Sequence, residues 1–160
     1  MSEKDKVTII VFSGELDKVL AAFNIATGAA AMGMEVSMFF TFWGLNVVRK
    51  ENPKISPSHI LQKMFGVVNP GGAGKLKLSK FHFGGIGTKM MQILMKRSLM
   101  PSAPEMVKMA FELGVTMIAC TTSMEFMGVN KVDLIDEVSR LTGVATYLAL
   151  AKDSKINLFI

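Results

Sequence analysis

Hydrophobic and polar positions alternate along the chain in blocks that predict strands and helices in turn. A continuous apolar, β-branched run at residues 7–12 predicts a strand buried on both faces, as in a parallel sheet. Residues 16–33 then repeat apolar side chains at helical spacing and end in glycine, which predicts a helix. A second apolar run at 35–42 predicts a second buried strand. This order is typical of the βαβ unit.

The same alternation returns in the C-terminal half. Ser102 opens a capping-box pattern with Glu105, and Gly114 ends the predicted helix. Residues 116–121 predict a third strand. A second capping-box pattern at 122–125 predicts a short helix directly after that strand.

The last part of the chain is less regular. Residues 131–141 have apolar positions that suit a helix, and a short edge strand near Val138 is the alternative. Thr142 is predicted to cap a further helix, and residues 156–160 are predicted to form a last buried strand. Such alternation predicts an α/β fold with an open, mostly parallel sheet and helices on both faces, layered as in flavodoxin and Rossmann folds.

A long insertion, at about residues 52–101, interrupts what is otherwise predicted to be a single domain over residues 1–160. Residues 71–108 carry seven basic groups and one acidic group, while the whole chain has a net charge of +5. Lysines alternate with apolar residues over 75–81, which predicts a two-faced extended segment, and 88–100 predicts a helix. We interpret the insertion as a mobile basic cover near the strand ends; the alternative is a solvated basic face over an oligomer contact.

The sequence is apolar enough for a membrane span to be considered, but its uncharged stretches are too short for one. Half of the residues are apolar and the mean hydropathy is +0.39. The longest uncharged stretches, 19–34 and 36–48, are nevertheless shorter than the ~18 residues that a spanning helix needs. No charged N-terminal region precedes an apolar stretch, so no signal peptide is visible and we expect a cytoplasmic protein. Fourteen methionines, many of them within 90–109, favour adaptable contacts between subunits.

Several kinds of site are excluded by what the sequence lacks. Cys120 is the only cysteine, which excludes an internal disulfide, a Cys-x-x-Cys redox pair and a multi-cysteine zinc site. His59 and His82 are too few and too far apart for a metal site, so no metal is expected. The glycine-rich residues 71–75 follow no predicted strand and lack the Ser or Thr that a phosphate loop requires. No recognition motif or basic–aromatic platform for nucleic acid is present.

Candidate site residues follow the predicted strands, because sites in open α/β sheets form outside the carboxyl ends of the strands. Ser13 and Gly14 follow the first strand, Thr41 and Trp43 the second, and Cys120 ends the third. The first four are candidate pocket residues. Their structural alternatives are a helix cap at Ser13 and sheet packing at Trp43.

Cys120 is the candidate catalytic residue. It is predicted at a strand end where a helix starts, and unpaired N–H groups there stabilise a thiolate and lower the thiol pKa. Thr121, Thr122 and Ser123 are the candidates for stabilising the thiolate, with plain capping as their alternative role. A buried packing cysteine is the other interpretation of Cys120.

Three stretches together resemble one known family. They are "IIVFSGELDKVLAAFNIATGAAAMGMEVSMFFTFWGL", "KLKLSKFHFGGIGTKMM" and "MIACTTSMEFMGV". They resemble the DsrE/DsrF-like sulfur-transfer family, and best its longer branch, often labelled "peroxiredoxin family protein". The peroxidase motif P-x-x-x-T-x-x-C is absent, since Leu113 and Met117 stand at its proline and threonine positions. The resemblance extends from about residue 7 to residue 160.

The resemblance implies a DsrE-like fold and a cytoplasmic, homo-oligomeric sulfur carrier, trimeric or hexameric. It places the family's persulfide on Cys120, with no other cofactor, and implies partners that are sulfur donor and acceptor proteins with reactive cysteines. A second hypothesis is a non-catalytic interaction module whose basic insertion binds an acidic protein or makes peripheral contact with an anionic membrane surface.

Overall fold

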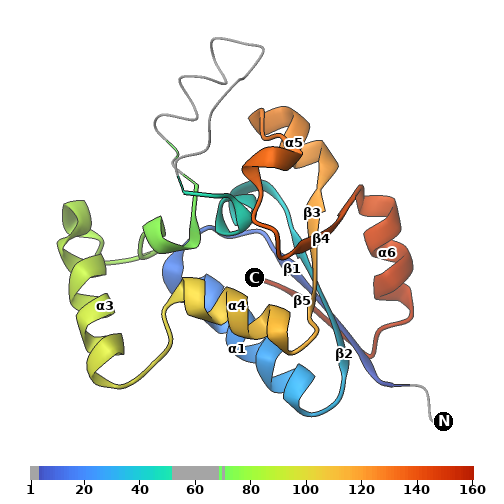
Figure 1. The fold of residues 1–160 in the computed structure, drawn as a ribbon, viewed down its shortest axis with the longest axis horizontal. Helices are drawn as coiled ribbons and strands as arrows, with labels where there is room; N and C mark the ends of the chain where they lie inside the picture. Colours follow the sequence, from blue (N-terminus) through green and yellow to red (C-terminus); the bar gives the residue numbers. More distant parts are fainter. Residues whose placement is uncertain (1–3, 52–68, 70) are drawn as a thin grey trace.

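A computed structural model of the chain describes residues 4–51, 69 and 71–160. Five parallel strands form one sheet in the order β4-β3-β2-β1-β5 (Figure 1). The strands are β1 (Lys6–Val11), β2 (Glu35–Phe40), β3 (Thr116–Cys120), β4 (Val138–Thr142) and β5 (Ile156–Phe159). The predicted open, parallel α/β sheet is therefore confirmed.

Helices cover both faces of the sheet, as predicted. On one face lie α1 (Leu16–Ala31) and α4 (Ala103–Glu112), and on the other lies α6 (Val144–Lys152) (Figure 1). The short α5 (Thr121–Met127) stands at the carboxyl end of β3, and α3 (Ile86–Arg97) stands apart from the sheet. Four 3₁₀ turns complete the described elements: η1 (Phe42–Val48), η2 (Ala73–Lys75), η3 (Phe83–Gly85) and η4 (Lys131–Asp133).

Alternate residues of the strands point to opposite faces of the sheet and contribute to two apolar layers of unequal size. The larger layer joins one face of the sheet to α1 and α4, and includes the rings of Phe23 and Phe40 with centroids 6.1 Å apart. The smaller layer, beneath α6, contains Phe39, Cys120 and Tyr147, and the two rings stack with centroids 4.9 Å apart. Because successive side chains of a strand point to opposite faces, both layers draw on the same continuous apolar runs.

Several predicted boundaries differ from those observed. β2 ends at Phe40 instead of residue 42, because Phe42 adopts a φ of +51° and opens a 3₁₀ turn. α5 begins at Thr121, so Cys120 itself is the N-cap residue and the predicted start at residue 122 is one residue late. Thr142 ends β4, and Gly143 takes the capping position predicted for Thr142.

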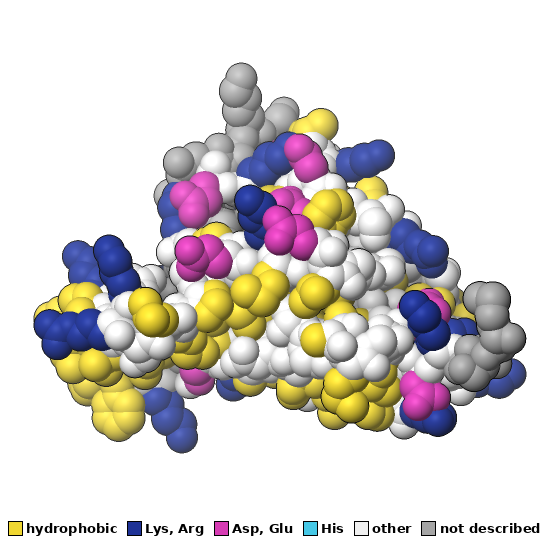
Figure 2. Space-filling model, turned by 60° about the horizontal axis from the view of Figure 1, so that its bottom comes forward, with side chains coloured by type: hydrophobic (Ala, Val, Ile, Leu, Met, Phe, Trp, Pro, Cys, Tyr) yellow, Lys and Arg dark blue, Asp and Glu magenta, His cyan; other side chains and the backbone are white. Residues whose placement is uncertain are grey.

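The predictions for the two edge strands had different outcomes. The alternative of an edge strand near Val138 is confirmed by β4. The prediction that residues 156–160 form a buried strand is wrong, because β5 lies at the other edge beside β1 alone and exposes Ile156 and Phe159. Exposed apolar side chains are spread over much of one face of the molecule (Figure 2).

The insertion contains the predicted helix, with bounds Ile86–Arg97 in place of 88–100. The two-faced extended segment is confirmed at Leu76, which is buried beside exposed lysines, but the expectation that Phe81 shares the apolar side is wrong because Phe81 is exposed. Residues 52–68 and 70, including His59, lie outside the described residues. Within the described ranges, no helix combines the length and apolar character needed to cross a membrane.

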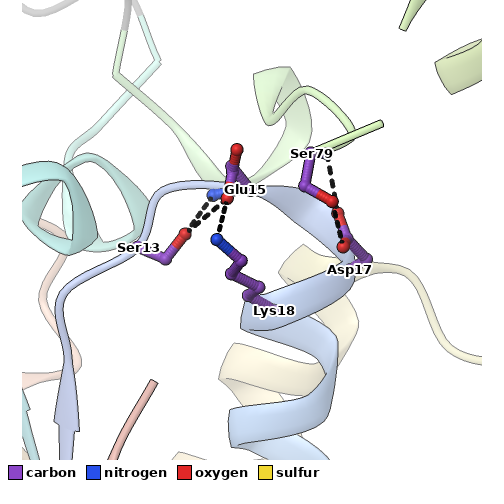
Figure 3. Close-up of polar contacts among 5 residues, drawn as sticks. All are labelled: Ser13, Glu15, Asp17, Lys18 and Ser79. Carbon is purple, nitrogen blue, oxygen red and sulfur yellow. Dashed lines mark hydrogen bonds and ion pairs between the residues drawn. The ribbon is translucent and has the colours of Figure 1, made fainter. Parts of the chain in front are cut away.

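The insertion is fastened to the first turn of α1 (Figure 3). Ser79 donates its N–H to Asp17 Oδ1 at 2.9 Å and its hydroxyl to Asp17 Oδ2 at 2.6 Å. Burial raises the pKa of Asp17, but the two hydrogen bonds from Ser79, with smaller contributions from the Asp17 N–H and the charge of Lys18, outweigh it, so the pKa lies below its ordinary value. The Leu16 N–H also donates to the Lys77 carbonyl at 2.8 Å. Residues 77–79 are thereby held close to the end of β1.

Candidate functional site

Cys120 lies at the carboxyl end of β3 and is the N-cap residue of α5. Its side chain belongs to the small apolar layer beneath α6, and the residue is only 4% exposed. Both interpretations made from the sequence, a packed cysteine and a cysteine at a helix start, describe its position. Cys120 is packed among apolar side chains and also stands where a helix begins.

Two hydroxyl groups lie beside this cysteine because β2 and β3 are neighbours in the sheet. Phe40 pairs with Ala119, so the next residues, Thr41 and Cys120, lie side by side at the carboxyl ends of β2 and β3. Thr41 Oγ1 and Ser123 Oγ share a hydrogen bond of 2.8 Å. The Phe42 N–H donates to Ser123 Oγ at 3.0 Å, which fixes the serine hydroxyl from the other side.

The pKa of the Cys120 thiol is lowered from its ordinary value. Burial acts in the opposite direction and raises it, because it disfavours the charged form. The N–H and hydroxyl of Ser123, then the hydroxyl of Thr41 and the N–H of Thr122, lower the pKa as hydrogen-bond donors beside the sulfur, and together they outweigh burial. Because the two hydroxyls also share one hydrogen bond, only one of them donates to the sulfur at a time. Such an environment favours the thiolate, which is the nucleophilic form.

The three residues proposed from the sequence to stabilise the thiolate differ in their placement. Ser123 is buried and acts through both its N–H and its hydroxyl, whereas Thr122 acts through its N–H alone. Thr121 is exposed and is not among the groups that lower the pKa. Thr41 was expected to line a pocket, and the structure places it against Ser123 instead.

The other candidate pocket residues lie together, away from the cysteine. Ser13, Gly14 and Trp43 line a pocket of about 460 Å³ with part of the insertion, including Lys77 and His82. Gly14 is required here, since a Cβ at this position would lie 2.7 Å from the Trp43 carbonyl oxygen. Cys120 is not among the residues that line this pocket. In this pocket the insertion borders the ends of β1 and β2. It does not cover Cys120 there, contrary to what the sequence had led us to expect.

A row of stacked aromatic rings crosses the carboxyl ends of the strands. Phe126 of α5 stacks on Phe42 with ring centroids 5.9 Å apart, Phe42 on Phe12 at 5.4 Å, and Phe12 on Phe159 at 5.5 Å. Trp43 adds an edge contact to Phe42 at 5.1 Å. Phe126 is 67% exposed, although it lies on the helix that Cys120 caps. We did not predict this row, and its sequence signal is an aromatic residue at the end of each of three strands.

A metal has no evident place in the described part of the chain, where no three His, Cys, Asp or Glu side chains are close enough to hold one. His82 Nδ1 shares a hydrogen bond of 2.8 Å with Thr88 Oγ1.

The parallel sheet, with a cysteine at the end of β3, defines an α/β protein with a thiol at the carboxyl end of its strands. The chain belongs to the DsrE/DsrF/DrsH-like family, whose model matches residues 3–159. The family resemblance seen in the sequence is thereby confirmed.

Two relatives match over almost their whole length. The chain is 45% identical to the uncharacterized protein YrkE of Bacillus subtilis, with all of both chains covered. It is 32% identical to the sulfur carrier protein DsrE2 of Allochromatium vinosum, with 99% of each chain covered.

Solved structures share the fold at low sequence identity. The MTH1491 protein of Methanobacterium thermoautotrophicum matches with a TM-score of 0.54 at 12% identity, covering 98% of this chain and 100% of that one. The YchN protein of E. coli matches with a TM-score of 0.55 at 10% identity, covering 99% and 100%.

Proposed function

We propose that the protein is a sulfur carrier that holds a persulfide on Cys120 and passes the outer sulfur to a protein partner. The observation that carries this proposal is the set of hydrogen-bond donors from Ser123, Thr41 and Thr122 around the only cysteine of the chain, which lowers its pKa. The full-length likeness to a protein named a sulfur carrier supports the same chemistry.

Loading and transfer are both exchange reactions at sulfur. In loading, the Cys120 thiolate attacks the outer sulfur of a donor persulfide R–S–SH. A new S–S bond forms, the donor's S–S bond breaks, and the donor leaves as the thiolate R–S⁻. In transfer, an acceptor thiolate attacks the outer sulfur of Cys120–S–SH and releases the Cys120 thiolate. Each step conserves atoms, charge and electrons, so a single cysteine is sufficient.

The surroundings of the sulfur suit a carrier. Phe39, Ile118 and Tyr147 pack in the same layer as Cys120, so bulk water has little access to the sulfur. The donors from Ser123 and Thr41 favour ionisation of the leaving Cys120 sulfur in the transfer step.

The exposed aromatic row beside the site supplies a surface for a donor or acceptor protein, because aromatic side chains are enriched at protein interfaces. We also propose that the carrier is a cytoplasmic homo-oligomer. The exposed apolar side chains of β5 and α6, among them Ile156 and Leu148, support subunit contacts.

The decisive experiment measures the intact mass of the protein after incubation with a small sulfane-sulfur donor. We expect the wild type to gain the mass of one sulfur atom and to lose it again when dithiothreitol is added. Cys120→Ser should gain nothing. Thr121→Ala, which alters an exposed side chain that does not act on the sulfur, should load like the wild type.

The non-catalytic interaction module makes the opposite prediction. If the wild type gains no sulfur from several donors, the carrier function is wrong and an interaction role remains. The exposed basic and apolar surface of the insertion favours an interaction role in its own right, and that surface is separate from Cys120.

A further inference from the structure

The helix α3 and the turns that flank it form an arm that stands away from the sheet (Figure 1). We call residues 80–100 the α3 arm. Of the twelve residues of α3, only Thr88 and Met95 are buried. Thr88 Oγ1 accepts the Leu78 N–H at 3.3 Å and shares a hydrogen bond with His82, so the side of the helix that carries Thr88 is fastened to the preceding segment.

The side of α3 opposite these two residues is apolar. Ile86, Met90 and Ile93 recur at i, i+4 and i+7, which places them on one face, and they are 69%, 60% and 53% exposed. On a helix of a globular protein the apolar stripe normally faces the core. Here it faces outward.

The ends of the α3 arm extend the same apolar surface. Phe81 is 73% exposed and Leu99 is 91% exposed, and Phe83 lies with its ring centroid 6.0 Å from that of Phe81. Phe81, Phe83 and Leu99 all have positive φ values, a conformation that costs free energy for bulky side chains. The turn is compact, since a Cβ on Gly87 would lie 1.6 Å from the Phe81 carbonyl oxygen. The aromatic side chains are therefore held outward by a defined backbone.

The charged side chains of the α3 arm itself have one sign, since residues 80–100 contain no Asp or Glu. Lys80, Lys89, Lys96 and Arg97 lie within the α3 arm. Figure 2 shows Lys and Arg side chains together with hydrophobic ones at the end of the molecule where the arm lies.

We propose that the α3 arm docks on the surface of an anionic membrane. Outward apolar side chains would enter the boundary between head groups and acyl chains, while the flanking lysines and Arg97 contact anionic head groups. Twelve residues span about 18 Å, so the helix lies in the interface instead of crossing the bilayer. A second copy of the chain is a poorer occupant, because a two-fold contact through this arm would bring cations against cations without an acidic partner.

The test is co-sedimentation of the full chain with lipid vesicles. We expect the wild type to bind phosphatidylcholine vesicles containing phosphatidylserine about tenfold more tightly than pure phosphatidylcholine vesicles, and to lose this preference as salt is raised. The variant Ile86→Ser, Met90→Ser, Ile93→Ser should lose binding to both. Its matched control, Met32→Ser with Val132→Ser, removes apolar side chains that are 81% and 76% exposed outside the α3 arm, and should bind like the wild type.

A second pair of variants tests the charges separately. Lys89→Gln with Lys96→Gln should weaken binding to the anionic vesicles about threefold, because two of the four cations of the arm remain, and should leave binding to neutral vesicles unchanged. The control Lys152→Gln changes an exposed lysine of α6 and should have no effect.

The proposal is overturned if the wild type does not sediment with anionic vesicles, or if the triple serine variant still binds them. A triple variant with a smaller mass in light scattering, together with a wild type that ignores vesicles, would assign the α3 arm to contacts between subunits. Cys120→Ser should bind vesicles normally, so failure of the carrier function and failure of membrane docking can be told apart.

Discussion

Replacing Ser123 by alanine tests whether the site is built to stabilise a thiolate. The substitution removes the hydroxyl and keeps the backbone N–H, so it deletes one of the groups that lower the pKa of Cys120. It also removes the acceptor of the Phe42 N–H and the partner of Thr41 Oγ1. We therefore expect the pKa of Cys120 to rise.

The size of the shift follows from the lost hydrogen bond. A hydrogen bond to a charged group contributes about 1.5–3 kcal/mol, and one pKa unit corresponds to about 1.36 kcal/mol. Because two backbone N–H groups remain and sulfur is a weak acceptor, we take the lower end, a rise of about one unit. A thiol of higher pKa is also a better nucleophile once ionised, with a Brønsted slope of about 0.4–0.5. At neutral pH the net effect is alkylation about threefold slower, and at high pH the variant overtakes the wild type.

The assay is the rate of alkylation by iodoacetamide against pH, followed by intact mass. Thr122→Ala is the matched control, because Thr122 acts through its N–H alone and this variant should keep the wild-type inflection. Thr41→Val should shift the inflection upward, by less than the serine variant. Equal inflections for Ser123→Ala and the wild type would refute the reasoning.

The lowered pKa also affects stability. A thiol whose pKa is lower in the folded state than its unfolded value of about 8.5 stabilises the fold above that value, and the contribution is lost as pH falls through the folded pKa. Ser123→Ala should reduce this dependence on pH.

Two further predictions concern the fold and the assembly. Gly44→Ala should destabilise the protein by about 3 kcal/mol, because its Cβ would lie 1.9 Å from the Val11 carbonyl oxygen. Gly28→Ala, on the open surface of α1, should stabilise it by about 0.5–1 kcal/mol. Equal melting temperatures for the two variants would contradict this. Light scattering should give a mass well above 17.4 kDa, and Leu148→Glu should lower that mass. A monomeric wild type at micromolar concentration would show that the exposed apolar face needs no subunit contact.

Most of the sheet could be predicted from the sequence, because buried parallel strands are encoded in continuous apolar runs. The place of Cys120 at a strand end followed from the same pattern. The role of Thr41 could not be predicted, because it depends on β2 lying beside β3 and on the turn at Phe42, and neither is a local property of the sequence. The exposure of β5 was mispredicted for a related reason, since an apolar run does not say whether a strand is central or at an edge.

The orientation of α3 shows a further limit of the pattern. Helical spacing of apolar residues identifies a face but not its direction, which is normally inferred from the preference of that face for the core. In this chain Thr88 receives the Leu78 N–H and bonds to His82, so its polar group can be buried without an unpaired donor or acceptor. Those bonds, together with the packing of Met95 in the core, hold this side of α3 inward. The apolar residues on the opposite side, with the lysines beside them, remain in contact with whatever lies outside the molecule.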